Sequence, residues 1–291
     1  MKNEKILTSS AGKYHESVMV KEVIESLHVN TSSQFIDCTL GTGGHTEAIL
    51  SAGGQVLGIE ADPKMLSVAK KRLSDQKVKL VLGNFVDIDQ IAKEKGFSDI
   101  DGILLDLGVS NLHLMDDDRG FSFTEGDQEL DMRLNPETQG VKASDLLNAL
   151  NVGQLTEMFN KVMDLGLSRK WAKRVISTRP YKTVNDLKKT AFDMPHKPGI
   201  DSATLPMLAL RIAVNSELEN LKVALKKAYN LLKKGGRLSV IVFHSTEEQV
   251  VKDFMRDEKN KGKLKLRLPN ENEIYKNKKS RSAKLYTYVK N

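Results

Sequence analysis

The feature that most constrains the fold is an alternation of short apolar runs with helical patterns over the first 110 residues. The apolar runs are 34–40, 54–62, 78–85 and 101–110, and helical patterns lie between them, one of which opens at Pro63. Proline is tolerated in the first turn of a helix. The fourth run is apolar on both faces, as a buried parallel strand should be. This alternation predicts an α/β fold with a doubly wound, mostly parallel sheet.

The alternation stops after the fourth strand and resumes about 95 residues later. Residues 114–209 contain no convincing strand pattern but four short helical ones, at 143–150, 153–163, 168–177 and 184–192. We then expect one long helix over 211–232, a strand fed by a Gly-Gly turn at 233–243, a helix at 246–259, and edge strands at 263–268 and 283–289. The simplest organisation is an α/β domain of residues 1–113 and 210–291, interrupted by an inserted all-helical domain of residues 114–209. Two unrelated consecutive domains are the alternative, but they would leave a truncated four-stranded sheet.

A glycine-rich turn, "GTGGHT" (41–46), follows the first strand. Gly41 permits a tight turn, and Gly43 and Gly44 would let a ligand approach the backbone at a helix N-terminus. The turn matches only the first half of G-x-G-x-x-G, with Thr46 at the third glycine position. A plain βα turn is therefore the competing interpretation.

Three acids end predicted strands around this turn: Asp37, Glu60 and Asp106. In a parallel sheet all three fall on the carboxyl edge, where ligands bind. Carboxylates disfavour the anionic pyrophosphate of a dinucleotide but suit the cationic sulfonium and ammonium groups of S-adenosylmethionine. Charge thus favours methyl transfer over hydride transfer. Alternatively, Asp37 and Asp106 cap backbone amides and Glu60 is solvated.

Charge is concentrated at the end of the chain. The formal net charge is +7, and residues 252–291 hold 13 Lys/Arg and 5 Asp/Glu. Such a segment favours a polyanionic partner, or else is a solvated tail. A single cysteine excludes an intramolecular disulfide and suggests a reducing compartment. With no leader pattern and no apolar run of the ~18–20 residues that a membrane span needs, we expect a cytoplasmic protein that does not enter a membrane.

Five stretches together resemble the RsmH (MraW) family. They are "DCTLGTGGHTEAIL" (37–50), "DGILLDLGVS…DDRGFSF…LDMRL" (101–134), "LRIAVNSELENL" (210–221), "GGRLSVIVFHSTEE" (235–248) and "RSAKLY" (281–286). The resemblance implies a class I, Rossmann-like methyltransferase with an inserted helical domain. It implies methyl transfer from S-adenosylmethionine, with S-adenosylhomocysteine as product, to the N4 amino group of a cytidine in the decoding region of small-subunit (16S-type) rRNA. The partner would be that RNA or the assembled small ribosomal subunit, and the inserted domain would recognise it.

The resemblance also assigns cofactor contacts. The cofactor loop falls on Gly43, Gly44 and His45, the ribose-binding acid on Glu60, and an aromatic residue near the adenine on Phe85. The fourth-strand acid falls on Asp106, and His113 stands where the family has glutamine. With the residues of the turn and its acids, the expected cofactor-binding set is Asp37, Gly41, Gly43, Gly44, His45, Glu60, Phe85, Asp106 and His113.

On the substrate side, we expect Asp106 to bridge the cofactor and the target amino group. His244 is the best-placed proton acceptor, ahead of His45 and His113, although a histidine capping a loop is nearly as good an interpretation. For RNA contacts we expect stacking by Phe121 and Phe123, unless both pack in the core of the insert. The expected phosphate contacts are Arg119, Lys278, Lys279, Arg281 and Lys284. No metal-ligand spacing occurs among the histidines, so no metal is expected.

Several motifs depart from the family pattern. "SSPQLD" reads "SNLHLM" (110–115) and "FHSLED" reads "FHSTEE" (243–248). An orthologue is favoured over a paralogue that methylates another RNA. A non-catalytic RNA-binding or assembly factor and a nucleotide-dependent oxidoreductase stay open as other classes, and so does a homodimer.

Overall fold

The computed structural model describes residues 17–115, 118–123, 127–196, 199–257 and 262–291. The opening residues, on which the absence of a leader was argued, lie outside this range. The chain divides into two compact units, residues 1–110 with 223–291 and residues 111–222. Both boundaries differ from the expected ones, the second by 13 residues. The reason is that helix α11 packs on α7 and α8 of the helical unit.

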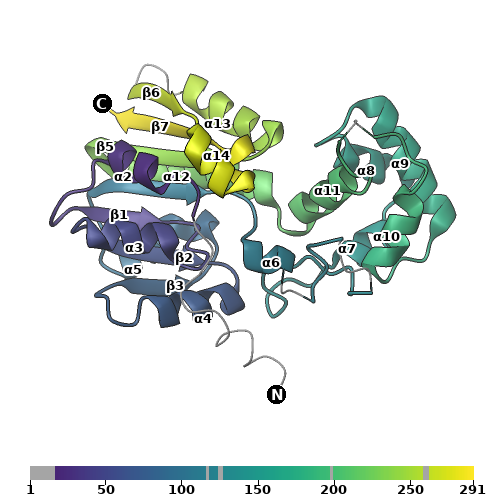
Figure 1. Ribbon diagram of the computed structural model, residues 1–291, viewed down its shortest axis with the longest axis horizontal. Coiled ribbons are helices and arrows are strands. Elements are labelled where there is room, and N and C mark those ends of the chain that lie inside the picture. The colour runs from purple at the N-terminus through teal and green to yellow at the C-terminus, as the bar shows by residue number, and fades with distance from the viewer. Residues whose placement is uncertain (1–16, 116–117, 124–126, 197–198, 258–261) are drawn as a thin grey trace. The chain divides into compact units, whose positions relative to one another are not determined.

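The first unit is built on a seven-stranded sheet of order β3-β2-β1-β4-β5-β7-β6 (Figure 1). Strands β1 to β5 are parallel, and β7 is antiparallel to both β5 and β6. This confirms the doubly wound, mostly parallel α/β fold. The strands are β1 (Gln34–Asp37), β2 (Gln55–Glu60), β3 (Lys79–Leu82), β4 (Ile100–Asp106), β5 (Leu232–Val242), β6 (Gly262–Arg267) and β7 (Lys284–Lys290).

We expected the segment 283–289 to be an edge strand, and this is wrong. β6 pairs with the outer side of this segment and is itself the edge of the sheet. The Gly-Gly turn is also absorbed into β5, where the pairing with β4 shifts register between Leu232 and Arg237. The helices of this unit are α2 (Val20–Leu27), α3 (Gly44–Ser51), α4 (Pro63–Arg72), α5 (Ile88–Glu94), α13 (Ser245–Asp257) and α14 (Glu271–Lys276), with 3₁₀ turns η1 (Phe85–Asp87) and η3 (Lys278–Ser282).

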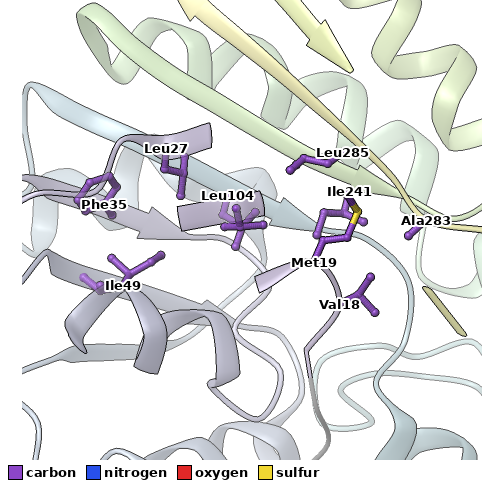
Figure 2. Close-up of a cluster of buried hydrophobic side chains, with 11 residues drawn as sticks. Val18, Met19, Leu27, Phe35, Ile49, Leu104, Ile241, Ala283 and Leu285 are labelled. Carbon is purple, nitrogen blue, oxygen red and sulfur yellow. The ribbon is translucent and has the colours of Figure 1, made fainter. Parts of the chain in front are cut away.

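A cluster of fully buried side chains fixes helices α2 and α3 on the sheet (Figure 2). Phe35 of β1 and Leu104 of β4 meet Leu27 of α2 and Ile49 of α3. Burying such a side chain stabilises the fold by roughly 1.5–3 kcal/mol. The cluster holds β1, α3 and β4 together, and these three elements carry the glycine turn and two of its acids.

Among the residues described, the regular elements of the second unit are helices, and an isolated antiparallel bridge joins Glu129 to Thr183. The unit contains α6 (Asn111–Met115), α7 (Ala143–Ala149), α8 (Val152–Phe159), α9 (Leu165–Thr178), α10 (Val184–Ala191) and α11 (Thr204–Val214), and α12 (Glu217–Leu231) crosses from this unit into the first. The four expected short helices correspond to α7, α8, α9 and α10. In the part of the chain that is described, no helix is long and apolar enough to cross a membrane.

The expected long helix over 211–232 is wrong. It is two helices, because Asn215 ends α11 and Ser216 adopts a left-handed conformation with φ 49°. Both patterns are amphipathic, so hydrophobic periodicity gave no sign of the break. Hydrogen bonds between the Asn215 side chain and backbone groups of Met132 and Leu134, 81 to 83 residues earlier in the sequence, stabilise the interruption between the two helices.

Candidate cofactor site at the carboxyl edge of the sheet

The site lies where the strand order reverses. β1 pairs with β2 on one side and with β4 on the other, so the connections that leave β1 and β4 diverge. Such a switch point leaves a crevice at the carboxyl ends of the strands. Asp37 is the last residue of β1 and Asp106 the last of β4. The Thr39 hydroxyl accepts a hydrogen bond from the Asp106 backbone amide, 2.6 Å, which ties the two strand ends together.

The glycine turn has the backbone shape expected of it. Gly41 and Gly43 have φ of 54° and 86°, and Gly43 caps the N-terminus of α3. The turn rests on a small buried cluster of Leu40 with Leu66 and Ala69 of α4 and Leu73, which caps the C-terminus of that helix. Gly44 is explained differently from our expectation: a Cβ there would lie 2.2 Å from the Ser17 hydroxyl. A side chain at position 44 would therefore require Ser17 to move, and the cofactor contact of Gly44 stays a prediction.

We expect Gly43→Ala to destabilise the first unit by about 1–2 kcal/mol, the cost of a left-handed conformation for a residue with a Cβ. The added methyl would also press on Leu73, 3.0 Å away. Gly140→Ala is the matched control, because its Cβ would meet nothing within 4 Å and its φ is not left-handed. Equal unfolding midpoints in urea for the two variants would contradict this explanation.

Asp37 and Glu60 are buried and brace the turn. Asp37 accepts from the Thr46 hydroxyl at 2.7 Å and from the Thr39 amide at 3.2 Å. Glu60 accepts from the amides of Gly41, 2.6 Å, and Asp62, 2.8 Å. Burial raises the pKa of Asp37, and it raises that of Glu60 to about 7 despite the two backbone hydrogen bonds. Thr46, at the third glycine position, thus has a role as the partner of Asp37.

His45 and Asp106 face each other across the turn. His45 Nε2 lies 3.3 Å from Asp106 Oδ2, and the imidazole is buried. Burial lowers the pKa of His45, but the Asp106 carboxylate, aided by Asp37 and Glu273, raises it by more, so the net shift is upward. Asp106 Oδ1 and both ring nitrogens of His45 have no aligned hydrogen-bond partner, although all three atoms are buried. Buried polar atoms without partners are rare, and three of them together at this edge of the sheet are consistent with a ligand that completes the bonding.

Phe85 follows β3 at the same edge of the sheet. It opens the turn η1, whose N-terminus is capped by the Asn84 side chain, 3.0 Å from the Val86 amide. The Phe85 side chain is half-buried. Its assignment to an adenine contact stays a prediction.

His244 follows β5 and is held by a residue that the sequence did not single out. Glu247 is buried, lies 3.0 Å from His244 Nε2 and accepts from the Phe243 amide at 2.8 Å. His244 Nδ1 in turn accepts from the Glu247 amide at 3.4 Å. These contacts are those of a histidine that caps the start of α13, which was the competing interpretation. The sequence feature that could have indicated this cap is the position of Glu247 three residues after His244, as in a capping box.

A groove of about 460 Å³ lies at the carboxyl end of β5. His244, Arg281 and Lys284 line it, with Leu268 and Ile274 on its apolar side. Lys284 is not a free cation, because its ammonium lies 2.7 Å from Glu248. The carboxylate of Glu248 has its pKa lowered to about 2 by Lys252, Lys284 and Tyr286. Lys278 and Arg281 are exposed on η3, and Lys279 belongs to the same turn, with its side chain outside the part described.

The remaining predicted residues belong to the helical unit and are engaged within it. Phe121 is buried and packs on His113, with ring centroids 5.0 Å apart. Arg119 lies over the same phenylalanine and donates to the carbonyls of Arg133 and Leu134 at 3.0 and 2.7 Å. Phe123 is half-buried. Phe121 is therefore a core residue of its unit, and Arg119 braces the chain beside it. The cofactor contact of His113 stays a prediction.

The residues of the first unit fit a cationic cofactor better than a phosphate-bearing one. Asp37, Glu60 and Asp106 converge on the turn. Besides burial, the charge of Asp106 raises the pKa of Asp37, and the charge of Asp37 raises that of Glu60. A cation among them relieves that repulsion, whereas a pyrophosphate adds to it.

Comparison with known proteins agrees with this geometry. The model of the MraW methylase family matches residues 12–291. The chain belongs to that family. The ribosomal RNA small subunit methyltransferase H of Dehalococcoides mccartyi is 38% identical, over 93% of this chain and 85% of the relative. The enzyme of the same name from Thermotoga neapolitana is also 38% identical, over 94% of each chain.

Among solved structures, a putative methyltransferase from Streptococcus mutans in complex with SAH superposes with a TM-score of 0.49 at 14% identity, over 95% of this chain and 100% of that one. Family membership makes the chain an S-adenosylmethionine-dependent methyltransferase. As an MraW methylase, it would hold the cofactor with the glycine turn, Glu60 and Asp106, the residues that converge at the switch point.

Proposed function

We propose that the chain transfers a methyl group from S-adenosylmethionine to the N4 amino group of a cytidine in the decoding region of small-subunit rRNA. The observation that carries the proposal is the half-buried Asp106 carboxylate at the switch point, with one oxygen buried and unpartnered and the other 3.3 Å from His45. An amino group carries two hydrogens that such a carboxylate can accept. The relatives named as small-subunit rRNA methyltransferases support the choice of RNA, and an rRNA substrate favours the cytoplasm as the place of action.

The bound cofactor supplies an electrophilic methyl group on a sulfonium. The residues of the chain then have three tasks. Glu60 would hold the ribose hydroxyls, since each of its oxygens keeps a lone pair beyond the backbone amide it already accepts. Asp106 would orient the target amino group by accepting hydrogen bonds from its N–H groups. This makes the nitrogen lone pair available and holds it in line with the methyl group, which can supply much of the acceleration. The buried His45, whose Nε2 lies 3.3 Å from Asp106 Oδ2, would help to hold the Asp106 carboxylate in position.

The test is nucleoside mass spectrometry of small-subunit rRNA from cells with and without the gene. Loss of N4-methylcytidine from the decoding region on deletion, and its return when the purified chain and S-adenosylmethionine are added to subunits from the deletion strain, are expected. Loss of a different modified nucleoside would instead support a paralogue. An unchanged nucleoside profile would support the non-catalytic assembly factor.

Cofactor affinity is expected to depend on pH through Glu60. Burial raises the pKa of this carboxyl from 4.5 to about 7, so it is protonated below that pH. Since the ionised form binds the hydroxyls and the cation better, the Kd for S-adenosylmethionine should rise about tenfold for each pH unit below about 7. Isothermal titration at several pH values measures this, and Glu60→Gln should bind more weakly with a flat profile. If the Kd of the wild-type chain were equally independent of pH, Glu60 would not be the ribose-binding group.

The same group affects stability in the cofactor-free chain. Its folded pKa lies above its unfolded value, so its contribution is fully present below pH 4.5 and is lost as the pH rises through about 7. Added S-adenosylmethionine should therefore raise the unfolding midpoint most at and above neutral pH.

A further inference from the structure

We propose that the hairpin of helices α9 and α10 is a docking surface for single-stranded, phosphate-bearing RNA. The inference rests on the proposed function, and it names where the helical unit would contact the substrate. Both helices belong to one unit, lie side by side in Figure 1, and are joined by an ion pair between Arg174 and Asp193, 3.0 Å.

The hairpin carries a concentrated positive charge. Residues 165–193 contain eight Lys/Arg and two acidic residues, and both acids are engaged. Asp186 accepts from the amides of Lys182 and Thr183, each at 2.9 Å, and Asp193 pairs with Arg174. The charge is therefore not balanced locally. Arg174 is held by Asp193 and Arg179 by the carbonyls of Leu147 and Leu150, so the other cations are the ones available to an anionic partner. The cations are Arg169, Lys170, Lys173, Arg174, Arg179, Lys182, Lys188 and Lys189.

The cations of α9 share one face because the opposite face is buried. The buried residues of α9 are Ser168, Trp171, Ala172 and Val175, the spacing of one helical stripe. Arg169, Lys170 and Lys173 then fall on the far side, and all three are exposed. Among the described contacts of the chain, none of the three takes part in an ion pair.

An exposed aromatic residue stands at the edge of this basic face. Phe192 caps the C-terminus of α10 and is 90% exposed, the most exposed of the large hydrophobic residues described. It directly precedes Asp193, whose ion pair with Arg174 places it next to α9. Cations with an exposed ring beside them are what single-stranded nucleic-acid sites use: the cations follow the phosphates and a base stacks on the ring.

The arrangement fits RNA better than a membrane surface. A helix that lies on a membrane presents a continuous apolar face. The apolar stripes of α9 and α10 are buried inside the unit, and the exposed large hydrophobic residues are Leu165, at the start of α9, and Phe192, after the end of α10. An acidic protein would use the cations and leave the ring without a specific role.

The test is binding of the full chain to purified small ribosomal subunits and to a decoding-region RNA fragment, between about 50 and 200 mM salt. In the triple variant Arg169→Gln, Lys170→Gln, Lys173→Gln, the slope of log K against log salt should fall in magnitude by about 2, at about 0.7 for each phosphate that is no longer neutralised. Phe192→Ala should weaken binding about fivefold to a hundredfold with the slope unchanged, as removal of a stacking ring does. The matched control is Lys70→Gln, Lys71→Gln, Lys77→Gln, which removes the same charge from exposed positions in and after α4.

Equal weakening by the two triple variants would overturn the proposal, because it would show an effect of net charge alone. Binding to vesicles of phosphatidylglycerol and phosphatidylcholine is measured in parallel. If the α9 triple variant lost binding to these vesicles but kept its binding to RNA, the proposal would also be overturned. Titration of S-adenosylmethionine into each variant checks that the first unit is unaffected. The mass-spectrometric assay decides the proposed function separately: if N4-methylcytidine depends on the gene but the α9 variant binds RNA normally, only the surface is wrong.

Discussion

Replacing Asp106 with asparagine should slow methyl transfer by about 10²- to 10⁴-fold, with a much smaller change in cofactor affinity. Asparagine keeps the shape of the side chain but turns one acceptor into a donor, which would oppose the hydrogens of the target amino group. The atom that matters is Oδ1, which is buried and has no aligned partner. Single-turnover transfer of a radiolabelled methyl group to small subunits measures the rate, and isothermal titration measures the cofactor affinity.

Asp99→Asn is the matched control. Asp99 precedes the other end of β4, is exposed, and has a φ of 50° that asparagine tolerates well. It should transfer methyl groups at the wild-type rate. Turnover close to wild type in Asp106→Asn, with cofactor affinity unchanged, would remove Asp106 from the reaction and leave it a role in bracing the turn with Thr39.

The parallel sheet and the glycine turn were predictable because each is a local pattern. Apolar runs flanked by helical periodicity gave β1 to β4, and a positive φ at Gly41 and Gly43 follows from the absence of a side chain. What the local pattern hid was the reason for Gly44, since Ser17, the residue that fills its space, lies 27 positions earlier.

The site was predictable in position but not in bonding. Asp37, Glu60 and Asp106 converge as the strand order requires, yet Asp37 and Glu60 also hold backbone amides of the turn. The alternative expected Asp37 and Asp106 to cap backbone amides and Glu60 to be solvated. Asp37 does accept from an amide, but Glu60 is buried and accepts from two amides. The cations of α9 were missed because they are interleaved with core residues in a helical pattern, whereas those at the end of the chain form a visible run.

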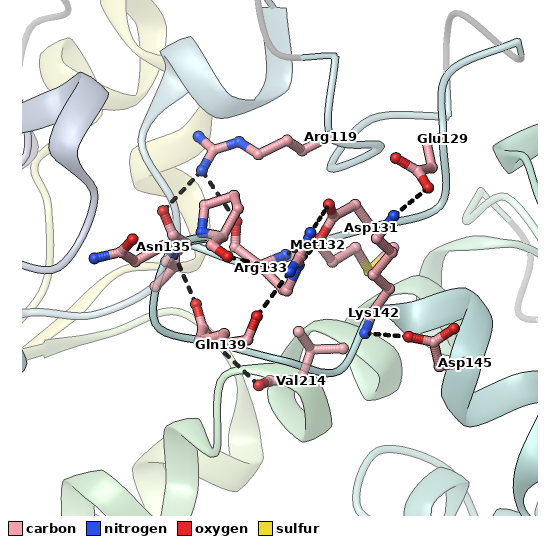
Figure 3. Close-up of polar contacts among 12 residues, drawn as sticks. Arg119, Glu129, Asp131, Met132, Arg133, Asn135, Gln139, Lys142, Asp145 and Val214 are labelled. Carbon is pink, nitrogen blue, oxygen red and sulfur yellow. Dashed lines mark hydrogen bonds and ion pairs between the residues drawn. The ribbon is translucent and has the colours of Figure 1, made fainter.

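The second large effect is expected in the helical unit, at Asn215. The "LDMRL" block (130–134), which belongs to one of the five stretches that carry the family resemblance, is anchored by this side chain. Asn215 accepts from the Leu134 amide at 3.1 Å and the Gln139 amide group at 3.0 Å, and it donates to the Met132 carbonyl at 2.9 Å. Figure 3 shows the segment it anchors, where Asp131 and Arg133 form a two-bonded ion pair at 2.7 and 2.8 Å.

Met132 shows why the anchor is needed. It has a φ of 63°, a conformation that costs a residue with a side chain about 1–2 kcal/mol. Such a residue persists only where its surroundings fix it. Here the Met132 amide donates to the Arg119 carbonyl at 2.8 Å, and Asn215 holds its carbonyl.

Asn215→Ala should therefore destabilise the helical unit by about 2–4 kcal/mol, because it leaves buried donors and acceptors of two segments without partners. Two compact units need not unfold together, so hydrogen–deuterium exchange is the suitable measurement. Exchange of the amides in 130–139 should accelerate roughly 30- to 1,000-fold, the same free energy expressed as a ratio. Amides of β1 and β4 in the first unit should exchange as in wild type.

Asn230→Ala is the control, since it makes the same substitution at an exposed position of α12. If its exchange in 130–139 matched that of Asn215→Ala, the anchoring role would be refuted. If only Asn215→Ala responded, the result would support the view that the helix is interrupted between α11 and α12 so that Asn215 can hold the "LDMRL" segment. An uninterrupted helix over 211–232 would carry Asn215 in a regular turn, where its amide could not reach two backbone groups of that distant segment.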